Sequence, residues 1–231
     1  MITGFDYINE NFKKIEYNLN EAKAKFRNPE DEISIMAVTK TVDPHAVNFA
    51  VANCGIRLLG ENRVQEYLSK KDEYAKASVH FIGQLQTNKV KYIIDSIDVI
   101  ESVDSLKLAS EIDKHAARIG KKQNVLVEVN IAGEEAKGGV APDKLEELLY
   151  EMSQLKNIQV TGLMTVPPAI DSEAFLYKMQ KIYIDISDKN IDNINMSLLS
   201  MGMSGDYELA VKYGSTQVRI GSALFGARVY K

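Results

Sequence analysis

The sequence predicts an α/β fold, a single (β/α)8 barrel of the TIM type with an extra helix at its N-terminus. Eight short strand-forming segments alternate with helical segments along the chain, which indicates a parallel sheet. Segments such as ISIMAV and VLVEVN are nearly continuous in apolar residues, as expected of strands that are covered by helices. The 231 residues are close to the ~250 of a typical barrel of eight such units.

An open, doubly wound sheet is the main alternative, but the number of units matches the closed form. No Gly-, Pro- or Ser-rich linker interrupts the chain, so we expect one domain over residues 1–231. The expected strands cover residues 33–39, 57–60, 79–83, 98–103, 125–131, 160–166, 195–200 and 217–220.

Local signals place the first two helices. An amphipathic helix is expected over residues 5–26, ahead of the first strand. Asp43 is expected to cap the next helix, which has Pro44 at its first position and Gly55 just past its end. These signals bracket the first strand between two helices.

Helices are also expected after each of the later strands. They begin near Glu61, at the caps Thr87 and Asp104, and near Pro142. The last of these four places a row of apolar residues on one stripe: Leu145, Leu148, Leu149, Met152 and Leu155. A helix of the ELAVKYG type follows the seventh strand, and a short helical turn follows the eighth.

Composition excludes several classes of function. With a net charge of -4 and no long basic run, the chain is not expected to bind nucleic acid or an anionic membrane. No stretch approaches the ~20 apolar residues that span a bilayer, and the charged N-terminal segment does not resemble a signal peptide. Cys54 is the single cysteine, and the three histidines lack ligand spacing, so no disulfide or metal site is expected. We expect a cytoplasmic protein.

The active site of such barrels lies at the carboxyl ends of the strands. The residues expected there are Lys40, Thr41, Glu61, Asn62, Gln84, Asn130, Met164 and residues 200–204 and 219–222. Lys40 leads this group because a partly desolvated amine has a lowered pKa and can form a Schiff base with an aldehyde. The alternative is a solvated lysine at a strand end.

Two loops have features that suit a phosphate ligand, and an arginine adds a separate constraint. Residues 200–206 and 219–226 offer small residues, backbone N–H groups and hydroxyls at the two strand ends where barrels often bind phosphate. Ordinary glycine-containing turns are the alternative. Arg219 lies in an apolar strand, where it needs either a carboxylate partner or a ligand atom. His80 is expected to be a satisfied core group, and Glu101 and Glu128 to form ion pairs inside the barrel.

Several motifs, in chain order, resemble the pyridoxal phosphate homeostasis proteins. They are AVTK (37–40), GEN (60–62), VQE (64–66), HFIG (80–83), LQTNK (85–89), GLM (162–164), SMGMS (200–204), RIGS (219–222) and FG (225–226). The resemblance spans nearly the whole chain. That family is similar to the barrel domain of alanine racemase and of ornithine-type decarboxylases.

The resemblance implies that pyridoxal 5′-phosphate (PLP) is the cofactor and that Lys40 holds it as a Schiff base. It implies that Ser204, Gly221 and Ser222 hold the phosphate, with Ser200 beside them in the same strand-end loop. Arg219 would face the pyridine nitrogen, and Asn62 and Met201 would lie near the ring. Two departures from the family pattern are visible: Val79 stands where Trp is usual, and Ser222 where Thr is commoner.

The residues favour a carrier over an enzyme. An arginine, with a pKa above ~12, does not readily protonate a pyridine nitrogen, so the ring stays a weaker electron sink. Racemases take a second acid/base group from another domain, and the chain ends about ten residues past the eighth strand. We therefore expect a monomeric PLP-binding protein of vitamin B6 homeostasis, without catalytic residues and with apo PLP-dependent enzymes as further partners. A PLP-dependent racemase or lyase of narrow activity and a lysine-dependent sugar-phosphate aldolase are the alternatives.

Overall fold

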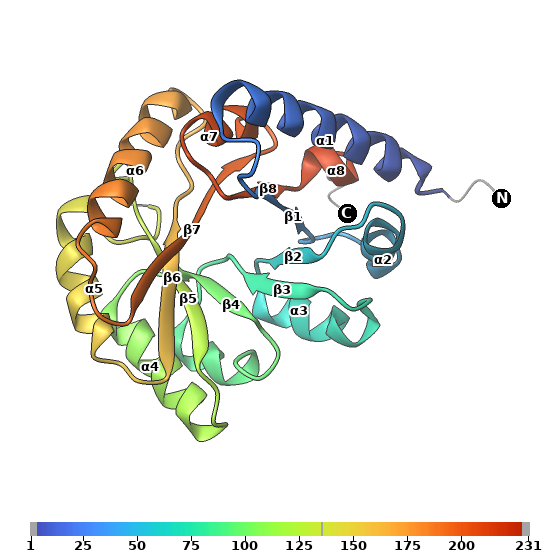
Figure 1. Cartoon of the computed structure of the whole chain (residues 1–231). Coiled ribbons are helices and arrows are strands. Elements are labelled where there is room, and N and C mark those ends of the chain that lie inside the picture. Colours follow the sequence, from blue (N-terminus) through green and yellow to red (C-terminus); the bar gives the residue numbers. More distant parts are fainter. Residues whose placement is uncertain (1–3, 135, 228–231) are drawn as a thin grey trace.

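Eight parallel strands close into a barrel in the computed structural model, which describes residues 4–134 and 136–227 (Figure 1). Each strand pairs with its sequence neighbours, and the first pairs with the last, with Ser34 opposite Gln217. This pairing confirms the closed barrel and excludes the open sheet. The strands are β1 (Ser34–Val38), β2 (Leu58–Glu61), β3 (Ser78–Phe81), β4 (Val99–Val103), β5 (Gln123–Glu128), β6 (Ile158–Met164), β7 (Ile194–Met203) and β8 (Gln217–Ile220).

Helices surround this barrel (Figure 1). The α-helices are α1 (Asp6–Phe26), α2 (Pro44–Asn53), α3 (Val64–Lys70), α4 (Leu106–Arg118), α5 (Leu145–Ser153), α6 (Ser172–Ser187), α7 (Tyr207–Lys212) and α8 (Ser222–Phe225). Three short 3-10 helices are η1 (Lys71–Glu73), η2 (Thr87–Tyr92) and η3 (Pro142–Lys144). Helix α6 lies between β6 and β7, where no side-chain hydrogen bond caps its start.

The helix caps agree with the sequence in one place and differ in two. Asp43 caps α2 by accepting a hydrogen bond from the His45 backbone N–H at 2.8 Å. The expected cap at Asp104 is wrong: the Ser105 hydroxyl accepts from the backbone N–H of Leu108, and its own O–H donates to Asp104. Thr87 is not a cap either, because it is the first residue of the 3-10 helix η2.

Two element bounds differ from the prediction near the site. Glu61 belongs to β2, and the helix expected to begin there begins at Val64. Strand β7 continues to Met203, so half of the expected phosphate loop is strand. Its pairing with β8 is irregular between Ser200 and Met203, where Gly202 has a φ of 93°. A Cβ at Gly202 would lie 2.4 Å from the Cβ of Ala210, so only glycine fits.

The core has two parts. A small apolar cluster of Val99, Leu126 and Met164 lies apart from the main core, in the barrel interior. The main core lies between the strands and the helices, and it includes Cys54 and Val79. Apolar side chains on both sides of the sheet explain why the strands are nearly continuous in apolar residues.

The extra N-terminal helix takes the place that a long final helix would fill. Helix α8 has four residues, whereas α1 has 21 and runs beside α7 and α8 (Figure 1). The Asn11 side chain donates to the backbone oxygen of Leu224 at 3.0 Å, and the Asn18 side chain donates to the Tyr207 hydroxyl at 3.1 Å. Helix α1 thus supports, from behind, the two helices that follow β7 and β8.

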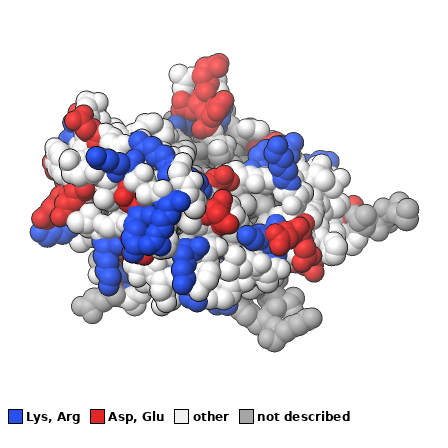
Figure 2. Space-filling model, turned by 90° about the horizontal axis from the view of Figure 1, so that it is seen from below, with Lys and Arg blue, Asp and Glu red and all other residues white. Residues whose placement is uncertain are grey.

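Charge is mixed over the surface. Figure 2 shows Lys and Arg side chains gathered left of the centre of one face, with Asp and Glu side chains around them. Among the described residues, no helix is both long enough and apolar enough to cross a membrane.

Candidate functional site

A cavity of about 390 Å³ opens at the carboxyl ends of the strands. Its size is within the range of small-molecule sites. It brings together side chains from β1, β2, β3 and the segments at β6 to β8: Val38, Lys40, Asn62, Ile82, Val166, Met203, Ser204, Gly205, Arg219, Gly221 and Ser222.

Six of the eight residues predicted to bind the cofactor line this cavity. They are Lys40, Asn62, Ser204, Arg219, Gly221 and Ser222. Ser200 and Met201 do not. Met201 is buried in the main core outside the barrel, and Met203 lines the cavity in its place. The irregularity at Gly202 explains the difference, because it breaks the alternation of inward and outward side chains along β7.

Lys40 comes directly before a strained turn. Thr41 has a φ of 63°, which is uncommon for a β-branched residue and costs on the order of 1–3 kcal/mol. The Thr41 backbone N–H donates to the Glu66 carboxylate at 2.5 Å, and the Lys70 ammonium donates to the same oxygen at 2.5 Å. Helix α3 therefore holds the turn that directs the half-buried Lys40 towards the cavity.

The opposite end of the cavity is built from hydroxyls and backbone N–H groups. The Ser204 hydroxyl accepts hydrogen bonds from the N–H groups of Gly221 and Ala223, at 3.3 and 3.2 Å. The turn before it is closed by Asp206, whose carboxylate accepts from the Met203 N–H at 2.7 Å. These contacts join the loops after β7 and β8 into one surface, lined by Ser204, Gly221 and Ser222, whose hydroxyls and small residues suit a phosphate group.

Arg219 forms part of the cavity floor and is 4% exposed. One of its terminal nitrogens donates to the Ser200 hydroxyl and the other to the backbone oxygen of Thr165, both at 2.7 Å. No carboxylate pairs with it directly among the described residues. Ser200 thus lies behind Arg219 and orients the guanidinium; it does not face the cavity.

The Ser200 hydroxyl, which accepts a hydrogen bond from Arg219, donates in turn to the buried carboxylate of Glu101. The Glu101 oxygens accept from His80 Nδ1, from the Gln217 amide and from the Ser200 hydroxyl, each at 2.6 Å. Burial opposes the ionised form of Glu101, but the hydrogen bond and charge of His80, and the charge of Arg219, outweigh it and lower its pKa. His80 is therefore a satisfied core group, as expected, and Glu101 has its ionic partner inside the barrel.

A second buried carboxyl lies beside Asn62. Glu61 accepts hydrogen bonds from the Thr39 hydroxyl at 2.6 Å and the Tyr74 hydroxyl at 2.5 Å. Its other oxygen has no hydrogen-bond partner among the described residues. Burial raises the pKa of Glu61, with the two hydrogen bonds opposing it. This carboxyl anchors β2 to the loop that carries Tyr74.

Glu128 lies at the end of β5, near the barrel mouth. Glu128 is two residues after Leu126 of the interior cluster, and residues two apart in a strand point to the same side, so its side chain faces inward. Burial, and then the neighbouring Asp104, raise its pKa to about 7, with Arg219 opposing the rise. No ion pair of Glu128 occurs in the described part of the chain. The expected internal pairing of this glutamate is thus not found.

Sequence reasoning missed the apolar wall of the cavity. It is formed by Val38, Ile82, Val166 and Met203. For the first three the signal was available, since each lies at an inward position near the end of a strand. The departure at Val79 does not affect this wall, because the Val79 side chain packs in the main core and does not line the cavity.

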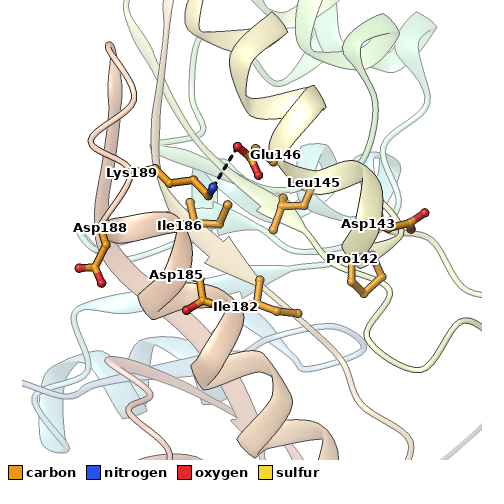
Figure 3. Close-up of a pocket in the computed structure, with 9 residues that line it drawn as sticks. All are labelled: Pro142, Asp143, Leu145, Glu146, Ile182, Asp185, Ile186, Asp188 and Lys189. Atoms are coloured by element: carbon orange, nitrogen blue, oxygen red, sulfur yellow. Dashed lines mark ion pairs between the residues drawn. The ribbon is translucent and has the colours of Figure 1, made fainter.

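A larger cleft, of about 600 Å³, lies elsewhere on the molecule. It runs between η3 with α5 on one side and α6 on the other (Figure 3). Its floor is apolar, and its rim carries Asp143, Asp185 and Asp188, with a 3.0 Å ion pair between Glu146 and Lys189. None of the predicted cofactor-binding residues lines it, so we place the candidate site at the barrel mouth.

Comparison with known proteins gives a consistent result. The family model described as "Alanine racemase, N-terminal domain" matches residues 11–229. The "Pyridoxal phosphate homeostasis protein" of Aquifex aeolicus is 39% identical over 227 residues, covering 96% of this chain and 98% of the relative. A structure of PipY from Synechococcus elongatus with PLP bound is 31% identical, with a TM-score of 0.79, covering 91% of this chain and 99% of PipY. A Bifidobacterium adolescentis protein described as unknown is 31% identical, with a TM-score of 0.89, covering 97% and 98%.

Proposed function

Since the chain belongs to the pyridoxal phosphate homeostasis protein family, we propose that it binds PLP in the cavity at the barrel mouth and serves in PLP homeostasis. One observation carries the proposal. A lysine, a donor-rich loop pair and a buried arginine line one cavity of suitable size. The aldehyde, the phosphate and the ring nitrogen of PLP call for these three groups.

The residues fit the cofactor one by one. Lys40 supplies the amine that holds the aldehyde as a Schiff base. Ser204, Gly221 and Ser222 bind the phosphate through hydroxyl and N–H groups. Arg219 keeps further N–H groups for the ring nitrogen beyond the two that bind Ser200 and Thr165, and Asn62 lies beside the ring. Bound in this way, PLP supplies an electron sink that Arg219 leaves weak, because a guanidinium does not readily yield a proton.

We therefore propose that the protein stores and releases PLP with no substantial turnover. We further propose that residues 1–231 are one PLP-binding domain, that the protein is a cytoplasmic monomer, and that apo PLP-dependent enzymes receive its PLP. Residues 1–3, 135 and 228–231 of that domain lie outside the described part of the chain. Sedimentation analysis tests the monomer, and PLP transfer to an apo-enzyme, compared with release into solvent, tests the delivery.

The Schiff base is tested by borohydride trapping. The purified protein with PLP is expected to absorb as an imine, to bleach on reduction and to carry the label on Lys40. Lys40→Ala is expected to lose the label. Lys121→Arg is the matched control: burial lowers the pKa of Lys121, and its amine donates to the backbone oxygens of Ile94 and Ile97, which do not line the cavity. A label on Lys121, or a colourless protein with added PLP, would refute the proposed site.

A PLP-dependent racemase or lyase is the second candidate, and Glu128 is the observation that favours it. Its raised pKa gives the barrel mouth one group able to exchange a proton near neutral pH. The two functions separate on incubation of the PLP-loaded protein with single amino acids in deuterated water. Storage predicts negligible exchange of the α-proton. Rapid exchange that disappears in both Lys40→Ala and Glu128→Gln would establish the enzyme instead.

A further inference from the structure

Next to the cavity at the barrel mouth lies a smaller pocket of about 250 Å³. It shares Asn62 with the larger cavity. Its other lining residues come from the loop that leads into α3 and the loop that leads into η2: Arg63, Val64, Gln65, Gln84, Gln86 and Lys89. The GEN-x-VQE and LQTNK motifs thus meet here, although few of their residues have a role in PLP binding.

The two loops are fixed against each other by direct backbone contact. The backbone N–H of Ile82 donates to the backbone oxygen of Glu61 at 2.8 Å. A Cβ at Gly83 would lie 2.0 Å from the backbone oxygen of Asn62, so the chains touch where no side chain fits. Glu61 itself is held by Tyr74, as described above. The backbone of the two loops is therefore held in one relative position.

The pocket chemistry is one-sided. It has two cationic side chains and four amides, and no carboxylate among its lining residues. Within the described residues, Arg63, Gln65, Gln84 and Gln86 make no side-chain hydrogen bond or ion pair. Lys89 has only the ring of Tyr92 nearby, at 5.9 Å. The charge of Arg63 helps to lower the pKa of Glu66, but the two residues form no ion pair. The Glu66 carboxylate already accepts hydrogen bonds from Lys70 and from the Thr41 N–H.

We propose that this pocket is a second binding site, for a small molecule that carries a carboxylate or a phosphate group. Guanidinium and amide N–H groups pair with either group, and the volume suits a molecule of amino-acid size. Because Asn62 lines both spaces, the anion lies directly beside the ligand of the larger cavity. The carboxylate source is an amino or keto acid; the phosphate source is a phosphate ester.

The inference goes beyond the proposed function, since its cationic residues, Arg63 and Lys89, have no role in holding PLP. Its test uses the full chain, isotope-labelled and loaded with PLP, so that the phosphate end of the larger cavity is filled. Sodium acetate and inorganic phosphate are titrated separately at constant ionic strength, with sodium chloride as the reference, because exposed charges are screened by salt. The side-chain amide signals of the three glutamines report binding in NMR spectra.

The test variant is R63Q/K89Q. The matched control is K91Q/R118Q, which removes one lysine from the same η2 helix and one exposed arginine from α4, neither of which lines the pocket. Lys91 also lies over the Tyr92 ring, at 4.9 Å. We expect saturable anion binding in the wild type and the control. In R63Q/K89Q we expect the affinity for the anion to fall about tenfold or more below that of the wild type. Borohydride labelling of Lys40 is expected to be unchanged in both variants.

Each result is decisive. Saturation by acetate alone assigns a carboxylate, by phosphate alone a phosphate ester, and by both a general anion site. No saturable shift in the wild type, or equal binding in R63Q/K89Q and the control, overturns the proposal. Loss of the Lys40 label in the wild type would refute the PLP site and leave the glutamine titration interpretable, so the two failures are distinguishable.

Discussion

Replacing Glu128 by glutamine tests the electrostatics of the barrel mouth. The carboxyl is half-buried at the end of β5, near Asp104, and its pKa is raised to about 7 from an ordinary 4.5. The folded protein therefore binds a proton at Glu128 that the unfolded chain has already lost above pH 4.5. Glutamine has nearly the same shape and no charge, so the substitution removes the ionisation and little else.

The sign follows from the proton balance. A carboxyl whose pKa is raised by folding stabilises the fold below its unfolded pKa, and this stability is lost as pH rises through its folded pKa. The full rise from 4.5 to about 7 corresponds to about 3 kcal/mol, at about 1.4 kcal/mol per tenfold change in proton affinity. We expect Glu128→Gln to gain about 2–3 kcal/mol over the wild type between pH 5 and pH 8.5.

The measurement is the free energy of unfolding in urea, without PLP, at both pH values for both proteins. Glu147→Gln is the control, because its side chain is 66% exposed and pairs only with Lys144 at the surface. The difference between Glu128→Gln and the wild type should grow with pH, whereas that of the control should stay constant. A difference for Glu128→Gln that is equal at pH 5 and pH 8.5 would refute the reasoning.

Three further substitutions test the scaffold. Gly83→Ala places a Cβ 2.0 Å from the Asn62 backbone oxygen, and we expect it to lower the free energy of unfolding by about 3 kcal/mol or more, measured in urea; full stability would show that the loops can separate. Ser200→Ala leaves an N–H of buried Arg219 unpaired and should cost about 1–3 kcal/mol and weaken PLP binding in an absorbance titration. Ser105→Ala removes the cap of α4 and should cost about 1 kcal/mol, measured by thermal unfolding; no loss would argue against its capping role.

The sequence predicted the barrel because its signals are local. Apolar strands covered by helices are continuous in apolar residues, and eight of them can be counted. Asp43 and Pro44 mark the start of α2 by backbone chemistry that acts within three residues. Asp104 failed as a cap because a serine follows it, and either side chain can accept the first N–H of the helix. The choice depended on tertiary surroundings that the sequence does not display.

The site could be predicted where strand ends decided it, and not where the chain departs from regular geometry. Lys40 and Arg219 follow from their positions on β1 and β8. That Met203 lines the cavity and Met201 does not could not be predicted in this way, because a single irregularity at Gly202 reverses which side chains of β7 face inward. The link from Arg219 through Ser200 to Glu101 is also invisible in sequence, because its members are far apart in the chain and meet only inside the closed barrel.

The predicted fold and the predicted site depend on each other. Lys40 and Arg219 come from the two ends of the chain, and they line one cavity only because β1 pairs with β8, with Met36 opposite Arg219. In an open, doubly wound sheet the order of the strands reverses part-way, and the first and last strands of the chain do not pair. Barrel closure therefore brings the Lys40 amine to the same cavity as Arg219 and the loops after β7 and β8. A protein whose β1–β8 pairing is weakened should lose PLP before it loses most of its helical structure.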